Sequence, residues 1–448
     1  NSLHPEVRMP SAAPAATRGS LHICMISVHG LIRGEQLELG RDADTGGQTR
    51  YVVELARAVA EQPGVGRVDL VTRLLDDAQI SADYSAPVES LSDRARIIRI
   101  RAGPPGYLPK ERLWDHLDGL VDNLRSFFQT QRQPDVVHGH YADGGYVGAR
   151  VSQALGVPLV VTGHSLGRVK RGRLIAAGLT AAEIEERYNL PRRIAAEELA
   201  LATAELVVAS TRQEVAEQYG RYDYYRPAQM LVTPPGVHFR RSPPPIGNER
   251  TGRIGRQIAR FLREPKRPII LALSRADARK NIAALVEAYA RDPVIAAAAN
   301  LVIVAGHRDD IDGLDPGSRE VWTDLLHQID RFDLYGQVAY PKHHTADEVP
   351  EIYRLAALSR GVFVNPALPE RFGLTLIEAA ASGLPVVSTE DGGPTDIIAN
   401  CRNGVLVDPL DIESIAAGIR DVLFDRKSWK RRAKSGLDGV RTHYSWPA

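Results

Sequence analysis

Residues 21–60 read LHICMISVHGLIRGEQLELGRDADTGGQTRYVVELARAVA and contain, in order, an apolar run, a long loop, a glycine pair and an amphipathic segment. The opening run is short and mostly apolar, which is typical of a buried strand. In Thr49–Ala60, the residues Val52, Leu55 and Val59 recur at helical spacing and share one helix face. The stretch therefore predicts a strand followed by a helix, the repeating unit of a parallel α/β sheet.

The same alternation continues along the chain and is interrupted once, at residues 234–248, which contain five Pro and two Gly. We therefore predict two tandem, doubly wound, Rossmann-like α/β domains. The expected division is a disordered leader (1–20), an N-terminal domain (21–235), a linker (236–266) and a C-terminal domain (267–448). The expected strands are Leu21–Val28, Arg67–Thr72, Arg96–Arg101, Asp135–His138, Pro158–Thr162, Glu205–Ser210, Met230–Thr233, Ile269–Ser274, Asn300–Ala305, Leu334–Tyr340, Gly361–Asn365, Pro385–Ser388 and Val405–Val407. Ligands of such sheets bind beyond the carboxyl ends of the strands, so we expect a cleft between the two domains.

The composition excludes several classes of protein. With 448 residues, 44% hydrophobic and 25% charged, the chain is neither fibrous nor wholly disordered. Because 56 basic residues balance 55 acidic ones, no general attraction to nucleic acid or to an anionic membrane is expected. No apolar run approaches the roughly 18 residues of a membrane helix. Cys24 and Cys401 are too few for a disulfide framework, which favours a reducing cytoplasm.

In the first half, candidate binding residues follow the expected strands. Gly46, Gly47 and Gln48 open the first long helix, where bare amides can face an anion, although a glycine pair also serves a tight turn. The dinucleotide fingerprint G-x-G-x-x-G is missing, which argues against NAD. Lys110 and the pair Arg192-Arg193 are basic residues that solvent exposure alone can explain. His164 follows the strand Pro158–Thr162 and has loop packing as its simpler explanation.

A metal site is the alternative for the histidines His138 and His140, which end another expected strand. Their spacing places both imidazoles on one strand face. The chain has no H-E-x-x-H motif and no further ligand pair at a suitable spacing, and His343-His344 lies in an expected polar loop. We therefore expect no metal and no bound cofactor.

The second half contains a more specific pattern. Arg275 and Lys280 lie between a strand end and a helix start, where cations suit a diphosphate. Glu370 and Glu378 flank the start of another helix near Gly373. Amides of that helix can meet phosphate, while the two carboxylates can accept hydrogen bonds from sugar hydroxyls.

Together these segments resemble the family 4 retaining glycosyltransferases of GT-B architecture, and among them the sucrose-phosphate synthases. The resemblance covers residues 21–446 and rests on Leu37–Gln48, His138–Asp143, Thr162–Gly167, Arg192-Arg193, the Arg275 to Lys280 segment, and Glu370 with Phe372-Gly373-Leu374 and Glu378. Arg371 departs from the pattern, which has Pro there. The resemblance implies transfer of glucose, with retention, from a nucleotide-glucose to fructose 6-phosphate, giving sucrose 6-phosphate. UDP-glucose is the expected donor, with ADP-glucose left open, and a sucrose-phosphate phosphatase is a conceivable partner.

The same resemblance implies a role for each candidate residue. Arg275 and Lys280 would hold the leaving diphosphate, Glu378 the ribose and Glu370 the glucose. His164 would hydrogen-bond the transferring glucose. The expected catalytic residues are His164, Arg275, Lys280 and Glu370. The expected donor-binding residues are Gly47, Arg275, Lys280, Phe372, Gly373, Leu374, Thr375 and Glu378, and the expected acceptor-binding residues are Gly46, Gly47, Gln48, Lys110, Arg192 and Arg193, with either arginine holding the acceptor phosphate.

Three other functions compete with this one. Sucrose synthase shares the glycine pair and the two glutamates but takes unphosphorylated fructose, and the basic residues Lys110, Arg192 and Arg193 argue against it. A mannosylfructose-phosphate synthase would differ only in its donor. A catalytically silent sugar-phosphate-binding protein is disfavoured because Arg275, Lys280, Glu370 and Glu378 are all present.

Overall fold

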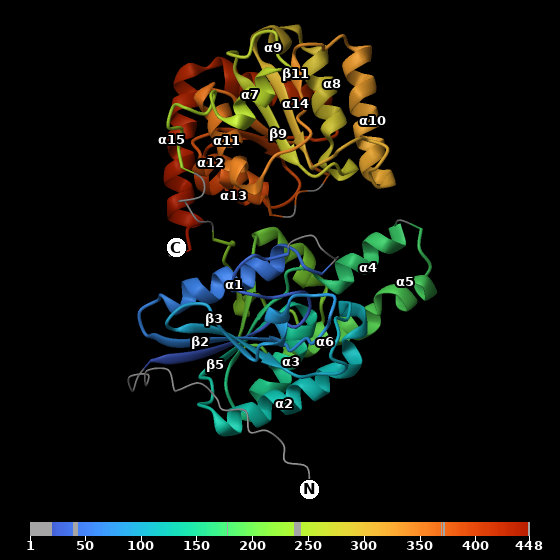
Figure 1. The fold of residues 1–448 in the computed structure, drawn as a ribbon, viewed down its shortest axis with the longest axis vertical. Helices are drawn as coiled ribbons and strands as arrows, with labels where there is room; N and C mark the ends of the chain where they lie inside the picture. The colour runs from blue at the N-terminus through green and yellow to red at the C-terminus, as the bar shows by residue number, and fades with distance from the viewer. Residues whose placement is uncertain are drawn as a thin grey trace. The chain divides into compact units, whose positions relative to one another are not determined.

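The structure is a computed structural model that describes residues 20–38, 44–176, 178–236, 243–368, 370 and 372–446. The expected leader up to residue 19 and the unusual Arg371 lie outside these residues. The chain divides into two compact units (Figure 1): unit 1 comprises Asn1–Ala209 and Glu214–Thr233, and unit 2 comprises Ser210–Gln213 and Pro234–Ala448. Each unit is built on its own sheet, so the predicted pair of α/β domains is confirmed.

Unit 1 contains an eight-stranded sheet with the order β3-β4-β2-β1-β5-β6-β7-β8. All neighbouring strands are parallel except β3 and β4. The strands are β1 (Leu21–Ile26), β2 (Val65–Arg73), β3 (Val88–Ser90), β4 (Ala95–Ile100), β5 (Val136–His140), β6 (Leu159–Thr162), β7 (Leu206–Ala209) and β8 (Met230–Val232). The main helices are α1 (Gly47–Ala60), α2 (Leu117–Thr130), α3 (Tyr141–Leu155), α4 (Gly167–Ala176), α5 (Ala181–Tyr188) and α6 (Leu190–Thr203).

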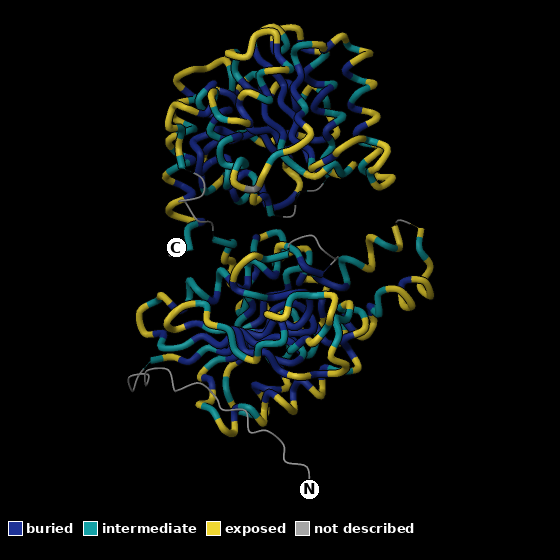
Figure 2. Tube along the Cα trace, in the orientation of Figure 1, coloured by how far each residue is buried: buried dark blue, intermediate teal, exposed yellow. Residues whose placement is uncertain are grey.

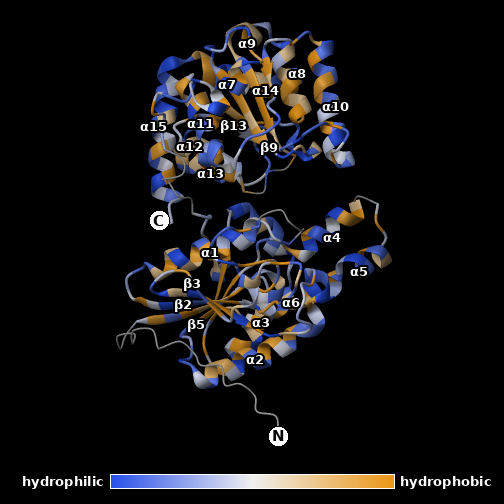
Figure 3. Ribbon diagram, viewed as in Figure 1, coloured by the Kyte–Doolittle hydropathy of each residue, from blue (hydrophilic) through white to orange (hydrophobic). Residues whose placement is uncertain are grey.

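Helices cover both faces of this sheet, because apolar side chains alternate along the central strand. Cys24 and Ile26 of β1 belong to the core that α2, α3 and α6 cover. Met25 faces the opposite way and packs with Val52 and Val53 of α1. A strand apolar on both faces must be covered on both, which gives the doubly wound arrangement. Figure 2 shows the resulting buried interior, and Figure 3 shows the hydrophobic strands within it.

Unit 2 contains a six-stranded parallel sheet with the order β11-β10-β9-β12-β13-β14. The strands are β9 (Ile269–Ser274), β10 (Asn300–Ala305), β11 (Val338–Ala339), β12 (Val362–Asn365), β13 (Val386–Thr389) and β14 (Gly404–Val407). The helices are α7 (Arg253–Ala259), α8 (Ile282–Arg291), α9 (Pro293–Ala298), α10 (Pro316–Arg331), α11 (Val349–Leu358), α12 (Leu374–Ala381), α13 (Pro394–Cys401), α14 (Ile412–Phe424) and α15 (Arg426–His443). None of the helices in the described residues is long and apolar enough to cross a membrane.

The central strand of unit 2 alternates in the same way. Leu271 of β9 packs with helices α7, α11, α12 and α15, whereas Ile270 packs with α8, α10 and α14 on the other face. Ile254 and Ile258 of α7 are buried in the first of these cores. This part of the expected linker is therefore built into unit 2.

All thirteen expected strands are present, most of them within two residues of the expected ends. Strand β3 was not predicted, because its three residues, Val-Glu-Ser, form no apolar run. Strand β11 was predicted over Leu334–Tyr340, but only Val338 and Ala339 pair with β10. Leu334 instead closes the turn after α10, where its amide donates to the carbonyl of Ile329.

Both sheets reverse their winding direction next to their first strand. In unit 1, β1 pairs with β2 on one side and with β5 on the other. In unit 2, β9 pairs in the same way with β10 and β12. At such a point the connections leave in opposite directions, so a crevice opens beyond the carboxyl ends of the strands. Each unit therefore offers one predictable place for a ligand.

The close approach of α3 to β1 gives a test of this packing. A Cβ added at Gly144 in the first turn of α3 would lie 2.4 Å from the carbonyl oxygen of Ile26. We expect Gly144→Ala to lower the stability of unit 1 by about 1–3 kcal/mol, because the backbone must shift. The matched control is Gly119→Ala in α2, where a Cβ would meet no described atom within 4 Å. Thermal unfolding of both variants decides, and equal melting temperatures would contradict this account of the packing.

Candidate functional site

The first part of the candidate site is the amino end of α1. Gly46 has an extended φ of −141°, and neither Gly46 nor Gly47 has a positive φ. A Cβ at either position would meet no described atom within 4 Å. Gln48, on the first turn, donates to the hydroxyl of Ser27 at 3.4 Å, just beyond β1. Neither backbone strain nor packing among the described residues accounts for the two glycines, so the open space suits a ligand that approaches the backbone closely.

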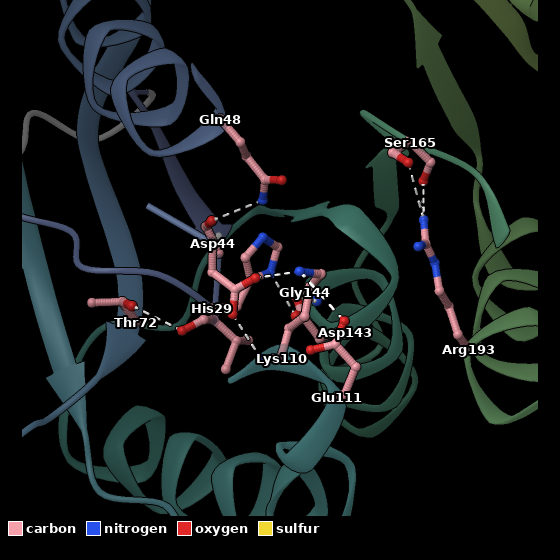
Figure 4. A network of polar contacts seen from close by, with 12 residues as sticks. His29, Asp44, Gln48, Thr72, Lys110, Glu111, Asp143, Gly144, Ser165 and Arg193 are labelled. Carbon is pink, nitrogen blue, oxygen red and sulfur yellow. Dashed lines mark hydrogen bonds and ion pairs between the residues drawn. The ribbon is translucent and has the colours of Figure 1, made fainter. Parts of the chain in front are cut away.

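Lys110 lies beside this helix end in a set of ion pairs (Figure 4). Its ammonium pairs with the carboxylate of Asp44 and lies 3.5 Å from a carboxylate oxygen of Glu111. Asp44 also accepts hydrogen bonds from the Lys110 amide at 2.9 Å and from the Tyr107 hydroxyl at 3.1 Å. Burial opposes the charge on Lys110, but the hydrogen bonds and charges of Asp44 and Glu111 together outweigh burial and raise the pKa of Lys110. Lys110 is therefore a cation at neutral pH.

The two adjacent arginines of α6 have different surroundings. Arg193 is 3% exposed, and its guanidinium donates to Glu197 at 2.9 Å and to the carbonyl oxygen of Ser165 at 2.6 Å. Arg192 is exposed and donates to Asp115 at 2.5 Å and to the carbonyl oxygen of Trp114 at 3.0 Å. Among the contacts of the described residues, only Arg193 reaches the loop that follows β6.

Glu197 connects that loop to the rest of unit 1. Its carboxylate accepts the amide of Gly167 at 3.0 Å and the hydroxyl of Tyr222 as well as the Arg193 guanidinium. Burial raises the pKa of Glu197, although Arg193 and the hydrogen bonds act against this rise. Nothing in the sequence singles out Glu197, because a glutamate four residues after an arginine resembles an ordinary surface pair on a helix.

A further cation, Lys170, was missed by the sequence analysis. It lies on the first turn of α4, with its ammonium 4.1 Å from the ring centre of Tyr188. Burial lowers the pKa of Lys170, and the nearby charges of Arg193 and Lys110 lower it further. We call Lys110, Lys170 and Arg193 the cationic cluster of unit 1. One feature of the sequence could have indicated a binding role for Lys170, namely its position six residues after His164. However, Lys170 lies in the basic run GRVKRGR (167–173), which resembles a solvent-exposed helix.

Histidines fill the carboxyl edge between β1, β5 and β6. His29 bonds Asp143 at 2.7 Å, and both side chains are buried (Figure 4). His138 bonds the Thr162 hydroxyl at 2.8 Å, and His140 bonds His164 at 3.0 Å. Burial lowers the pKa of His138 to about 4 and that of His164 to about 3. The rings of His138 and His164 are therefore neutral at physiological pH.

The histidine spacing does not build a metal centre in the part of the chain that the structure describes. No group of three or more His, Cys, Asp or Glu residues lies there in a position to hold a metal ion. The imidazoles of His138 and His140 are instead tilted against each other with ring centres 4.0 Å apart.

In unit 2, the reversal of winding brings together two residues that lie 90 positions apart. The ammonium of Lys280, after β9, donates to Glu370, after β12, at 2.6 Å. The same carboxylate oxygen accepts the side-chain amide of Asn365 at 3.0 Å. Gly392 lies against this residue with a φ of +117°, and a Cβ there would lie 1.8 Å from the carbonyl oxygen of Glu370. Glu370 is thus held from three sides.

The other cations of this segment differ in their partners. Arg279 donates to Asp277 at 3.0 Å, and this bond is the main reason that the pKa of Asp277 falls to about 2. Arg275 is exposed at the carboxyl end of β9, and its guanidinium makes no hydrogen bond or ion pair with a described residue. Arg275 is therefore available to an anionic ligand, whereas Arg279 is already neutralised.

Helix α12 supplies the remaining predicted residues. It starts after Gly373, whose φ of +99° is a conformation that favours glycine. The amides of Leu374 and Thr375 lie in its first turn, where an α-helix has no backbone acceptors for them. Glu378 lies one turn further on, with its carboxylate 3.3 Å from the hydroxyl of Tyr353. The predicted arrangement of a helix end flanked by Glu370 and Glu378 is therefore present within unit 2.

Comparison with known proteins identifies the class. A family model described as glycosyl transferases group 1 matches residues 255–437, and one described as a glycosyl transferase 4-like domain matches residues 46–236. A solved structure of an Anabaena protein in complex with UDP and glucose covers 95% of this chain and 96% of its own, with a TM-score of 0.61 and 17% identity. The chain therefore belongs to the group 1 glycosyltransferases with GT-B fold.

Two further relatives identify the family within this class. The maize sucrose-phosphate synthase is 44% identical over 95% of this chain and 46% of its own length. The structure of the sucrose-phosphate synthase from Thermosynechococcus elongatus is 28% identical, with a TM-score of 0.68, over 95% of this chain and 96% of its own. The chain belongs to the sucrose-phosphate synthase family. It spans about half the length of the curated relatives it matches.

Proposed function

We propose that the protein transfers glucose, with retention, from a nucleotide-glucose to fructose 6-phosphate, producing sucrose 6-phosphate and a nucleoside diphosphate. UDP-glucose is the donor we favour, because a structural neighbour of the same fold was solved with UDP and glucose. Unit 1 binds the acceptor in this proposal and unit 2 binds the donor.

The observation that carries the choice of a phosphorylated acceptor is the cationic cluster of unit 1. The charges of Lys110 and Arg193 both act on the ammonium of Lys170 and lower its pKa. Like charges that act on one another are unfavourable unless anions accompany them, and here the anions are Asp44, Glu111 and Glu197. A phosphate dianion offers more acceptor oxygens than a carboxylate, so it can compete for the two lysines. Free fructose has no such group.

Lys110 and Lys170 are the phosphate ligands we favour, because both are partly exposed, whereas Arg193 is buried and bonds Glu197 and Ser165. Arg193 then acts by fixing the loop that carries His164. Arg192, on the exposed side of α6, is not needed in this arrangement.

At the donor end, Arg275 and Lys280 hold the diphosphate, and the first turn of α12 adds amide donors. Lys280 has three N–H donors, so it can keep one bond to Glu370 and direct the others to phosphate oxygens. Only one oxygen of Glu370 has a partner among the described residues. The other can accept hydrogen bonds from glucose hydroxyls, while Glu378 accepts them from the ribose.

The chemistry follows from the placement of these charges. The bond between glucose C1 and the phosphate oxygen breaks, and negative charge grows on the diphosphate that Arg275 and Lys280 face. The acceptor hydroxyl oxygen of fructose 6-phosphate bonds to C1 on the same face, and its proton passes to the departing phosphate oxygen. Family resemblance suggests this front-face route, in which no carboxylate nucleophile is required.

Acceptor choice is the central test of the proposal. We expect the catalytic efficiency with fructose 6-phosphate to exceed that with fructose about a hundredfold or more, because two charge-assisted bonds are lost with the neutral sugar. The double variant Lys110→Ala, Lys170→Ala shrinks this preference, whereas Arg125→Ala, which removes a half-exposed cation on α2, leaves it unchanged. Equal efficiencies of the wild type on both acceptors, measured at matched ionic strength, would favour a sucrose synthase instead.

The glycine pair provides a second test. We expect Gly47→Ala to leave the melting temperature unchanged or slightly raised, since the added Cβ meets no described atom and alanine favours helix. The same methyl group occupies the space proposed for the acceptor, so the Michaelis constant for fructose 6-phosphate rises about tenfold or more. Steady-state kinetics and thermal unfolding check this pair of outcomes. Unaltered kinetics would show that the acceptor does not approach α1.

Donor binding can be tested without turnover. Glu378→Gln replaces a charged acceptor of the ribose hydroxyls with a neutral one, which weakens binding by about 1.5–3 kcal/mol. Calorimetry with UDP measures the effect, and Glu287→Gln on α8 is the control because, among the described residues, its carboxylate pairs only with the exposed Arg291. A dissociation constant equal to that of the wild type would remove Glu378 from the donor site.

A further inference from the structure

Three imidazoles form a column beside the candidate acceptor site. His138 and His140 lie on one face of β5, with ring centres 4.0 Å apart. His164 follows β6, and its ring is stacked 5.3 Å from that of His140. Tyr51 of α1 packs edge-on against His164 at 5.2 Å. Rings packed in this way have little freedom to rotate, so the direction of each N–H group is fixed by its hydrogen bonds.

The contact between His140 and His164 needs one proton and one lone pair. Nδ1 of His140 lies 3.0 Å from Nε2 of His164. Burial lowers the pKa of both rings far below neutrality, so each carries a single proton on one of its two nitrogens. Two arrangements are possible, with the shared proton on either His140 or His164, and they leave opposite groups on the far side of each ring.

The surroundings of the second ring nitrogen of His140, Nε2, decide between these two proton arrangements. Its Nε2 is buried and has no hydrogen-bond partner among the described residues. A buried N–H without an acceptor is more unfavourable and rarer than a bare lone pair. The proton of His140 therefore belongs on Nδ1, where it is donated to Nε2 of His164. His164 must then carry its own proton on Nδ1.

His164 differs from His140 in being reachable from outside. Its side chain is partly exposed, and its Nδ1 makes no hydrogen bond with a described residue. Its backbone has a φ of +56°, a conformation that is unusual for a residue other than glycine. Two hydrogen bonds hold the loop in this conformation. The amide of Gly163 donates to the Tyr219 hydroxyl at 3.0 Å, and the guanidinium of Arg193 donates to the carbonyl oxygen of Ser165. The Nδ1–H of His164 is thus presented in a fixed direction.

We propose that His140 is a positioning residue that fixes His164 as the Nδ1–H tautomer, so that His164 donates a hydrogen bond to a hydroxyl oxygen of the transferring sugar. This proposal rests on the function proposed above, in which His164 contacts that sugar. His138 takes no part, because its Nε2 bonds Thr162 and not His164.

The tautomer can be measured directly on the full chain labelled with ¹⁵N-histidine. Long-range ¹H–¹⁵N spectra at neutral pH distinguish a protonated from an unprotonated ring nitrogen, and His164→Asn identifies the signals of His164. We expect Nδ1 of His164 to be protonated and Nε2 to be bare. A spectrum with the proton on Nε2 of His164 would overturn the proposal whether or not the enzyme is active.

Kinetics test the consequence for the reaction. His140→Phe keeps a ring but removes the donor, whereas His140→Asn places an amide N–H near the position of Nδ1. We expect His140→Phe to lower kcat about tenfold or more, with the Michaelis constant of fructose 6-phosphate little changed, because one directed hydrogen bond is lost in the transition state. His140→Asn recovers part of this loss.

His138→Phe is the matched control, since it places the same substitution two residues away on the same strand face and leaves the contact between His140 and His164 in place. We expect its kcat to stay within a factor of about three of the wild type. Equal losses for the two phenylalanine variants would mean that packing alone is responsible, and would overturn the role of His140. A wild-type protein without transferase activity would contradict the proposed function, while the tautomer measurement would still stand.

Discussion

The reversal of winding beside the first strand of each sheet is the constraint on which the candidate binding residues of each unit depend. Parallel strands bring all their carboxyl ends to one edge, and helices leaving in opposite directions leave that edge uncovered at one point. In unit 1 this point lies between β1 and β5, next to His29, Asp143 and Gln48. In unit 2 it lies between β9 and β12, where Lys280 meets Glu370. Residues distant in sequence become neighbours because the strand order requires it.

Much of this fold is predictable from the sequence because buried parallel strands leave a strong signal. Runs such as Ile269–Ser274 are apolar on both faces and are bounded by turn residues, so their ends can be placed closely. The signal fails where a strand is held by pairing alone. The short antiparallel strand β3 has no apolar run. For β11, the predicted run Leu334–Tyr340 begins in the turn that follows α10 and not in the strand.

The sequence predicts where the candidate site residues lie along the strands, but it does not predict which carboxylate pairs with which cation. His164, Arg275 and Lys280 were found because each follows a strand, and that rule needs no knowledge of the strand order. Which carboxylate neutralises which cation depends on distances between strands, so the partnership of Asp44 with Lys110 could not be read from the sequence. The adjacent arginines show the same limit. Successive residues of a helix point in different directions, so Arg193 is buried and Arg192 is exposed, although the two look alike in the sequence.

The pairing of cations with carboxylates bears on how such a site can release its products. Lys110 and Lys280, which the proposed function assigns to phosphate groups, each contact an acidic side chain. A phosphate that binds there displaces or shares a carboxylate rather than meeting a bare positive charge, so the net gain is smaller than the charges alone would give. This moderates the affinity for every phosphate, including the diphosphate that leaves in the proposed reaction. Discrimination is retained, because a neutral sugar cannot compete with a carboxylate at all. In the proposed reaction, Arg275, with no described ion-pair partner, is then the group whose full charge responds to the departing diphosphate.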